Sequence, residues 1–454
     1  MPTVVNPATG ETGRSFPELG DDQIEATLAR AAETYREWRL TSSAERAALL
    51  NAIADQYDAH RDRLAATITE EMGKPIRQAR AEIAKCAGGF RFYAEKGPRM
   101  LEPFEVEVKQ GRAMAHWLSQ GPVLAIMPWN YPFWQVVRFL APTIMAGNVG
   151  LLKHASSTPG CAAALEEMVT AAGAPEGLFQ NLHIPSSKVA GIIADRRVVA
   201  VTITGSEGAG IKVAEAAGRD LKKVVLELGG SDPFIVMPSA DVAKAAEVAV
   251  TARFQNAGQS CICGKRMIVH ADIYDAFMER FTAGVNALKV GDPTDEATEM
   301  GPLSSEGARD DIQKLLDKAV AQGATKLCGG ATPDKPGAWM DPAILVDIPE
   351  DAPVMREEFF GPVAMVFKVA DLDEAIALAN DIPFGLGSSV WTDDEGEQQR
   401  FIRDIEAGMT AINQMLVSDP HAPFGGIKRS GHGRELSQYG LHEFMNLKSV
   451  MMTG

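Results

Sequence analysis

The chain has 454 residues, which exceeds the usual size of a single hydrophobic core and predicts two large lobes. Its 46% hydrophobic and 23% charged residues are typical of an ordinary globular protein. The formal net charge of −16 argues against nucleic acid as a partner, because binding to phosphates requires clustered lysine and arginine residues.

Cysteine usage and the polar start of the chain indicate a cytoplasmic protein. Residues 1–14 lack the basic start and apolar core of a signal peptide. No apolar run approaches the roughly 18 to 20 residues that a membrane span requires. Five cysteines with one close pair do not resemble a secreted disulfide framework. The histidines are scattered without the spacing of ligands, so we expect no metal site.

Residues from about Asp21 to Met100 are predicted to be helical. Ser42 and Glu45 have the spacing of a capping box, and apolar residues follow at helical intervals. Residues 104–117 alternate as in an extended hairpin. Residues 444–452 also look extended, and could pair with the hairpin around Val106 or with a partner subunit.

From Gly121 onward, short apolar strands alternate with helical segments. The clearest strands are 123–127, 150–153, 198–202 and 224–228, with helices at 158–172 and 209–217. A second round starts near Pro233 and includes strands at 266–269 and 363–369 and helices at 274–288, 309–321 and 371–380. This alternation predicts an α/β protein with a parallel, doubly wound sheet.

A cysteine and a glutamate in the middle of the chain are the strongest candidates for chemistry. Cys261 lies in a turn of small and polar residues, and Glu227 ends an apolar run. A cysteine attacks well only as a thiolate, and a carboxylate in an apolar setting can accept a proton near neutral pH. The simpler alternative is a buried structural cysteine beside an ordinary glutamate at the end of a strand.

The residues around these two positions carry a family resemblance. Phe-x-Asn-x-Gly-Gln-Ser-Cys ends at Cys261, and Glu-Leu-Gly-Gly-x-Asp-Pro begins at Glu227. Both resemble motifs of the aldehyde dehydrogenase superfamily, and the likeness extends from residues 6–11 to residues 423–431. The resemblance implies an aldehyde dehydrogenase-like α/β fold. Its parts are a Rossmann-type doubly wound cofactor domain, an α/β catalytic domain and a small β element for oligomerisation.

The resemblance also implies where these parts lie in the chain. We expect the cofactor-binding domain at 1–100 and 120–228 and the catalytic domain at 229–428. The oligomerisation or bridging element is expected at 101–119 and 429–454. A homodimer or a homotetramer is implied, and the sequence does not choose between them.

By the same resemblance, three residues carry the reaction. Cys261 attacks an aldehyde, and Asn130 with the backbone N–H of Cys261 holds the resulting oxyanion. Glu227 then activates water to hydrolyse a thioester. Asn130 lies in the rigid turn Met-Pro-Trp-Asn-Tyr-Pro, where it could instead be only an Asx-turn residue. The rival interpretations are a cysteine hydrolase, which would not need the cofactor motifs, and a structural protein that kept an old fold.

The cofactor is expected to be NADP, with NAD possible. In many NAD-using relatives a glutamate stands where this chain has Ser156, and its carboxylate binds both ribose hydroxyls and repels a 2′-phosphate. Serine removes that charge, although a helix N-cap is the alternative role for Ser156. The resemblance implies a cofactor site made of Trp129, Asn130, Lys153, His154, Ala155, Ser156, Gly205, Ser206, Gly210, Leu228, Glu358 and Phe360.

The resemblance implies succinate semialdehyde as the substrate. Family members that oxidise it carry an arginine at the place of Arg138 and a serine at the place of Ser418, which bind the distal carboxylate. Trp134 could line the same channel. A second carboxylate-binding arginine of some members is Gln255 here, so a broader aliphatic or glutarate-type semialdehyde range is the alternative. The alternative for Arg138 itself is a surface residue at a helix flank.

Cys263 lies two residues after the candidate nucleophile. A Cys-x-Cys pair could close reversibly to a disulfide and stop activity under oxidation. Closure requires a compliant loop, because the two side chains must converge. The alternative is that Cys263 is simply a small apolar residue.

Overall fold

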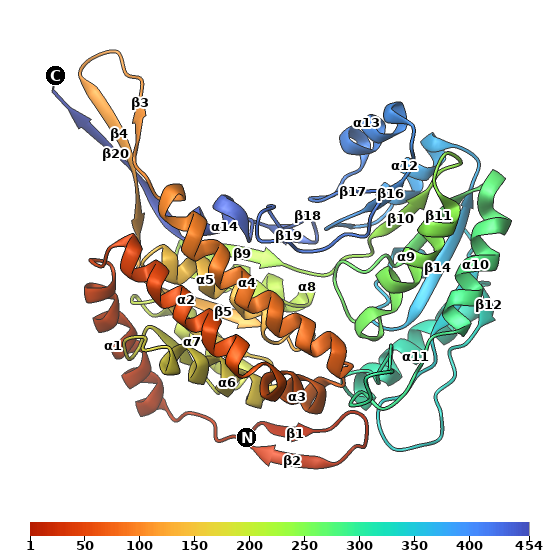
Figure 1. Ribbon diagram of the computed structural model, residues 1–454, viewed down its shortest axis with the longest axis horizontal. Helices are drawn as coiled ribbons and strands as arrows, with labels where there is room; N and C mark the ends of the chain where they lie inside the picture. Colours follow the sequence, from red (N-terminus) through yellow and green to blue (C-terminus); the bar gives the residue numbers. More distant parts are fainter. Residues whose placement is uncertain (454) are drawn as a thin grey trace.

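Two large sheets, one in each lobe, organise residues 1–453, which the computed structural model describes (Figure 1). The first sheet has the strand order β19-β9-β8-β5-β6-β7, and every neighbouring pair except β19–β9 is parallel. Its strands are β5 (Pro122–Met127), β6 (Val149–His154), β7 (Phe179–Asn181), β8 (Ala200–Thr204), β9 (Lys223–Glu227) and β19 (Gly431–His432). The predicted parallel α/β alternation is confirmed for this lobe.

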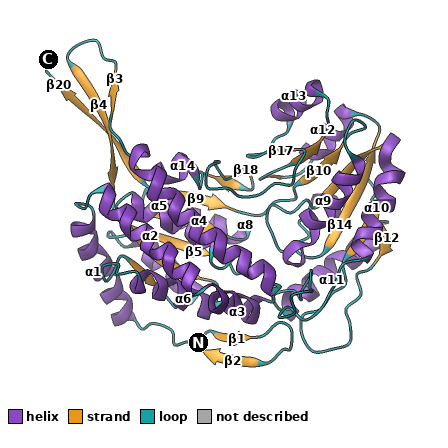
Figure 2. Ribbon diagram, viewed as in Figure 1, coloured by secondary structure: helices purple, strands orange, loops and turns teal. Residues whose placement is uncertain are grey.

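Helices surround the first sheet (Figure 2). They bury its apolar side chains in one hydrophobic core. The predicted capping box is present, because Ser42 Oγ accepts from the N–H of Glu45 at 3.2 Å and Glu45 Oε2 accepts from the N–H of Ser42 at 2.7 Å. The N-terminal helices are α1 (Asp21–Trp38), α2 (Ser43–Ala59), α3 (Arg61–Met72) and α4 (Ile76–Met100). The others are α5 (Trp134–Met145), α6 (Pro159–Ala171), α7 (Val189–Ala194), α8 (Glu207–Arg219) and α14 (Ser437–His442).

One strand of this sheet starts two residues later than predicted. β8 begins at Ala200, whereas the apolar pattern places its start at position 198. The N–H of Val198 donates to the carbonyl of Asp195 at 3.1 Å, so it closes a turn and does not join the ladder. The strand runs from Ala200 to Thr204 and ends directly before the glycine-rich turn.

The second lobe contains a seven-stranded sheet in the order β12-β13-β14-β11-β10-β16-β17, parallel except for β12–β13. Its strands are β10 (Pro233–Val236), β11 (Arg266–His270), β12 (Thr325–Cys328), β13 (Ala343–Val346), β14 (Val363–Val369), β16 (Ser389–Trp391) and β17 (Ala411–Ile412). Its helices are α9 (Val242–Phe254), α10 (Tyr274–Asn286), α11 (Glu306–Ala321), α12 (Leu372–Asn380) and α13 (Glu395–Asp404). The predicted second round is confirmed.

Short elements complete the chain. Two-stranded sheets join β1 (Thr3–Val5) to β2 (Thr12–Ser15), and β15 (Phe384–Gly385) to β18 (Ile427–Lys428). The 3₁₀ turns are η1 (Ser186–Lys188), η2 (Gln255–Gly258), η3 (Ala271–Ile273) and η4 (Pro353–Arg356). Within residues 1–453, no helix has the length and apolar character that crossing a bilayer requires, and no His, Cys, Asp and Glu side chains gather in a metal-binding group.

A three-stranded antiparallel sheet projects from the first lobe (Figure 1). It consists of β3 (Phe104–Val106), β4 (Arg112–Ser119) and β20 (Met445–Met452), in the order β20-β4-β3. The predicted pairing of the C-terminal strand with the hairpin is confirmed, and its direct neighbour is β4 rather than the strand that contains Val106. Phe104, Leu447 and Met451 leave apolar surface exposed here. A homodimer or homotetramer stays a prediction.

The division into three domains also stays a prediction. Residues 101–119 form the projecting sheet with β20, as the bridging element requires. Gly431 and His432 instead add strand β19 to the edge of the first sheet, although the sequence places them in the bridging element.

A buried ion pair fixes the start of α5. Glu82 on α4 and Lys74 in the preceding loop pair with each other, and their side chains are 2% and 1% exposed. The other oxygen of Glu82 accepts from the N–H groups of Phe133 and Trp134, both at 3.0 Å. The carboxylate thereby satisfies backbone donors that the first turn of a helix leaves open.

Substitution Glu82→Gln is expected to destabilise the protein by about 3 to 5 kcal/mol, because the buried Lys74 ammonium loses its partner. Thermal and urea unfolding of the variant measure this loss. The matched control is Glu95→Gln on the same helix, whose exposed pair with Lys96 should contribute little. Equal unfolding midpoints for the two variants would contradict the role of the buried pair.

Candidate active site

Cys261 follows a loop that has an unusual backbone. Asn256 and Ala257 have φ values of 52° and 53°, a left-handed conformation that costs free energy in residues with a side chain. Hydrogen bonds hold this loop in place. Asn256 Nδ2 donates to the carbonyls of Asn130 at 3.0 Å and Gln259 at 3.2 Å, and the N–H of Asn256 donates to Gln78 Oε1 at 2.9 Å. The loop that precedes Cys261 is therefore tied to the turn that contains Asn130 and to α4.

Arg253, at the end of α9, joins this loop to the segment that carries Glu358 and Phe360. Its side chain is fully buried, and its Nε donates to the carbonyl of Val363 at 2.7 Å. Its Nη2 donates to the carbonyl of Phe359 at 2.9 Å and also to that of Gly361. Its Nη1 donates to the carbonyl of Gly258 at 3.4 Å. The guanidinium of Arg253 thus bonds to both loops and fixes the distance between them.

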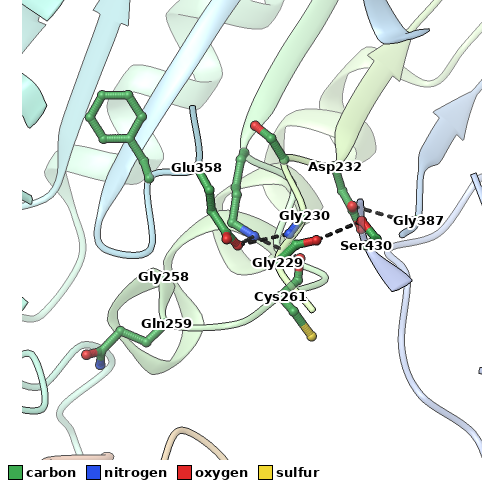
Figure 3. A network of polar contacts seen from close by, with 12 residues as sticks. Gly229, Gly230, Asp232, Gly258, Gln259, Cys261, Glu358, Gly387 and Ser430 are labelled. Atoms are coloured by element: carbon green, nitrogen blue, oxygen red, sulfur yellow. Dashed lines mark hydrogen bonds and ion pairs between the residues drawn. The ribbon is translucent and has the colours of Figure 1, made fainter. Parts of the chain in front are cut away.

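A second buried cation, Lys265, links Cys261 to Glu358. Its Nζ donates to the carbonyl of Cys261 at 2.8 Å and pairs with Glu358 Oε1 at 2.8 Å. The same carboxylate oxygen of Glu358 accepts from the N–H of Gly230 at 3.2 Å (Figure 3). A Cβ at Gly229 would lie 2.3 Å from Glu358 Oε2, so only glycine leaves room for the carboxylate. Sequence reasoning missed both Arg253 and Lys265, which flank the cysteine motif.

The thiol of Cys261 lies at a cavity of about 230 Å³, below the roughly 300 to 1,000 Å³ typical of sites for drug-sized ligands. A small substrate fits such a space. Burial, together with the smaller effects of Asp232 and Glu227, raises the pKa of Cys261 to about 12. The cations Arg138 and Lys265 oppose this rise. The free protein therefore holds Cys261 as a thiol.

Asn130 is buried beside the nucleophile loop, as the sequence predicts for an oxyanion group. Its Nδ2 donates one hydrogen bond, to the carbonyl of Gln259 at 3.0 Å. An amide nitrogen carries two N–H bonds, so the second is left for a ligand.

Glu227 ends β9 beside the same region but does not line the cavity of Cys261. Within residues 1–453, neither of its buried carboxylate oxygens has a hydrogen-bond partner. Burial raises the pKa of Glu227 well above its ordinary value, Glu435 raises it further and Arg138 opposes. A Cβ at Gly425 would lie 2.7 Å from Glu227 Oε1, so the carboxyl packs directly on that backbone. This is the environment of a base that binds its proton readily.

Arg138 lies on α5 and lines the cavity of Cys261. It is 3% exposed, which rules out the alternative of a surface residue. Its Nε lies 2.8 Å from Glu435 Oε2, its Nη2 donates to Gln135 Oε1, and its guanidinium stacks 4.2 Å from the ring centre of Phe424. Much of its charge is therefore offset by Glu435, a partner that the sequence did not reveal.

The other predicted substrate residues line the same cavity, and a lysine joins them. Trp134, Gln255 and Ser418 all contribute to its wall. Ser418 Oγ accepts from Trp134 Nε1 at 2.8 Å and from Lys85 Nζ at 2.7 Å. Lys85 is on α4 and was missed by sequence reasoning. The amphipathic pattern of a long helix does not indicate which of its cations faces a ligand.

Predicted cofactor residues meet at the ends of β6, β8 and β9. Lys153, the penultimate residue of β6, is half-buried. Burial lowers its pKa, and it takes part in no ion pair formed within residues 1–453. Ser156 is exposed, and the N-cap residue of α6 is Thr158, so the capping alternative for Ser156 is wrong. A desolvated cation beside a free hydroxyl suits an anionic ligand.

His154 and Ala155 lie at the end of β6 and hold the neighbouring backbone in place. His154 Nδ1 accepts from the N–H of Ala155 at 2.8 Å, so Nε2 carries the proton and donates to the carbonyl of Pro132 at 2.9 Å. Burial lowers the pKa of His154 to about 4, which keeps the ring neutral. The ring therefore joins the end of β6 to the turn between β5 and α5.

The glycine-rich turn after β8 has the predicted geometry of a strand entering a helix. The N–H of Gly205 donates to the carbonyl of Glu227 at 3.0 Å, and Ser206 caps α8 by accepting from the N–H of Ala209. A Cβ at Gly210 would lie 2.6 Å from Leu228 Cδ2, so glycine allows α8 to pack closely on the end of β9.

Two aromatic rings complete the corner. The rings of Trp129 and Phe360 meet edge to face, with centroids 5.8 Å apart.

Cys263 is fully buried, while Cys261 is partly exposed. A disulfide between the two cysteines stays a prediction.

Comparison with known proteins gives one consistent result. The model of the aldehyde dehydrogenase family matches residues 2–450. The succinate-semialdehyde dehydrogenase [NADP(+)] of Mycolicibacterium paratuberculosis is 54% identical over 450 residues, covering 98% of this chain and 95% of the relative. Succinate-semialdehyde dehydrogenase [NADP(+)] 1 of Mycobacterium tuberculosis strain H37Rv is 52% identical, with 98% of each chain covered.

A solved structure agrees. The succinic semialdehyde dehydrogenase from Streptococcus pyogenes, determined in complex with NADP+, superposes with a TM-score of 0.98 at 38% identity and covers 100% of both chains. The fold class implied by the sequence is confirmed. This chain belongs to the aldehyde dehydrogenase family.

Proposed function

We propose that the chain oxidises succinate semialdehyde to succinate and reduces NADP. The observation that carries the proposal is the single cavity that joins Cys261 to Arg138 and Ser418. A thiol at one point of the cavity and a guanidinium at another match an aldehyde that carries a carboxylate. The names of the similar mycobacterial and streptococcal enzymes support the same substrate and cofactor.

In the proposed reaction, the thiol of Cys261 gives its proton to solvent and its sulfur adds to the aldehyde carbon. The free N–H of Asn130 and the backbone N–H of Cys261 donate to the oxygen of the thiohemiacetal. Oxidation of that carbon leaves a thioester on Cys261. Glu227 turns from Gly425 towards the cavity and removes a proton from water, which attacks the thioester and releases the acid.

The residues present fit a phosphorylated dinucleotide. Lys153 supplies a cation for the ribose and its 2′-phosphate, and Ser156 supplies a hydroxyl in place of a repelling carboxylate. The N-terminus of α8 offers backbone N–H groups to a pyrophosphate. Glu358, between Lys265 and Gly230, is placed to bind the nicotinamide ribose. When bound, the nicotinamide accepts the hydride that leaves the substrate carbon.

Substitution Cys261→Ser is expected to lower kcat/KM by about a thousandfold or more, because a hydroxyl is a far weaker nucleophile. Absorbance of reduced nicotinamide after mixing with succinate semialdehyde and NADP measures the rate, and absence of this signal in wild type would favour a hydrolase. Cys328→Ser in the distant strand β12 is the control and should keep wild-type activity. A fully active Cys261→Ser variant would remove the proposed mechanism.

Glu227→Gln is expected to lower kcat by roughly a hundredfold to ten-thousandfold while leaving a rapid first turnover. Because burial raises the pKa of Glu227, its basic form increases as pH rises, and wild-type thioester hydrolysis should accelerate with pH. The variant should lose that dependence and show a burst of one reduced cofactor per site. Glu215→Gln on the exposed face of α8 serves as control. Linear kinetics at the wild-type rate would exclude Glu227 as the base.

Ser156→Glu is expected to shift the ratio of kcat/KM for NADP over NAD at least tenfold towards NAD, because the new carboxylate repels the 2′-phosphate. Tenfold corresponds to about 1.4 kcal/mol. Ser187→Glu adds the same charge at an exposed site of the same lobe and should leave the ratio unchanged. A wild-type enzyme that prefers NAD tenfold would overturn the assignment of the cofactor.

A further inference from the structure

We propose that Lys85 is the cation that selects substrates with a distal carboxylate, an assignment that rests on the proposed function. Lys85 lies on α4 and lines the cavity that also contains Cys261 and Arg138. Its Nζ donates to Ser418 Oγ at 2.7 Å and lies 4.5 Å from the ring centre of Trp134. Ser418 and Trp134 therefore hold the ammonium at the cavity wall.

The charges around the cavity leave Lys85 without a counter-ion. The guanidinium of Arg138 lies 2.8 Å from the buried carboxylate of Glu435. Glu82 also borders the cavity, but its carboxylate is used by Lys74 and by the start of α5. Within residues 1–453, no carboxylate lies within ion-pair distance of Lys85. A desolvated cation of this kind favours an anionic ligand.

Lys85 also accounts for the neutral residue at position 255. Gln255 lines the same cavity and can donate a hydrogen bond, but it contributes no charge. With Arg138 offset by Glu435, the net positive charge that faces the ligand comes from α4. An ammonium with three donors can keep its bond to Ser418 and still donate to a carboxylate.

The protonation of Lys85 makes this selectivity depend on pH. Burial, together with the neighbouring charge of Arg138, lowers the pKa of Lys85 to about 8, although Cys86, Glu82 and Asp419 oppose this shift. Below that pH the ammonium is present and attracts the substrate carboxylate. Above it, the free enzyme loses the charge, so preference for the semialdehyde over an uncharged aldehyde should fall.

The experiment compares kcat/KM for succinate semialdehyde with kcat/KM for butanal, which has four carbons and no carboxylate. Taking the ratio removes effects on the shared chemistry at Cys261. Lys85→Met is expected to lower this ratio about 10- to 100-fold, the usual effect of losing a hydrogen bond to a charged group. Lys85→Arg should retain most of the ratio, and it should abolish the decline of the ratio above pH 8, because arginine stays protonated.

Lys96→Met is the matched control, since it removes one exposed lysine from the same helix and should not change the ratio. A Lys85→Met ratio within twofold of wild type would overturn the role of Lys85. If that variant does not fold, the wild-type profile decides, because a ratio that stays constant from pH 7 to 9.5 overturns the proposal equally. Absence of semialdehyde oxidation by wild type would instead refute the proposed function itself.

Discussion

The position of the candidate nucleophile depends on one buried guanidinium. Arg253 donates to carbonyls of the Cys261 loop and of the loop that carries Glu358, and within residues 1–453 it forms no ion pair with a carboxylate. Burying such a charge is costly unless its donors are satisfied, and here backbone oxygens satisfy them. The planar fork of donors makes the spacing between the two loops rigid. A strained, left-handed backbone at Asn256 and Ala257 persists because this frame holds it.

Groups around Cys261 shift the pKa of its thiol in opposite directions. Burial and two carboxyl groups hold the thiol in its protonated form, while Arg138 and Lys265 favour the thiolate. The net effect raises the pKa of the thiol, and any change that brings positive charge closer increases the thiolate fraction. Lys265 bonds the backbone carbonyl of Cys261 and the carboxylate of Glu358, so it connects the backbone of the candidate nucleophile to the residue proposed to hold the nicotinamide ribose.

Local sequence patterns predicted most of the first lobe, because its helices and strands are long and periodic. They missed β12, β13, β16 and β17, which have only two to four residues, too few to establish a period. The start of β8 was misplaced because Val198 is apolar like a strand residue but closes a turn. Apolar character alone does not distinguish the two.

Some residues of the candidate site could be predicted from sequence motifs, and others could not. Cys261, Glu227 and Asn130 each lie in a contiguous motif, so their neighbours in sequence identify them. Lys85 and Ser418 are 333 residues apart, and their contact exists only in the folded chain. Glu435 is likewise brought to Arg138 by tertiary structure, and no spacing rule connects them.

The last part of the chain returns to the first lobe after passing through the second. Residues 431–432 form strand β19 at the edge of the first sheet, and Glu435 pairs with Arg138. Strand β20 pairs with β4 in the projecting sheet. During synthesis, the first lobe therefore cannot complete its sheet edge or the ion pair of Arg138 until residues 431–452 have left the ribosome. Until then it exposes an unpaired strand edge and an uncompensated buried cation, both of which favour misassembly and chaperone binding.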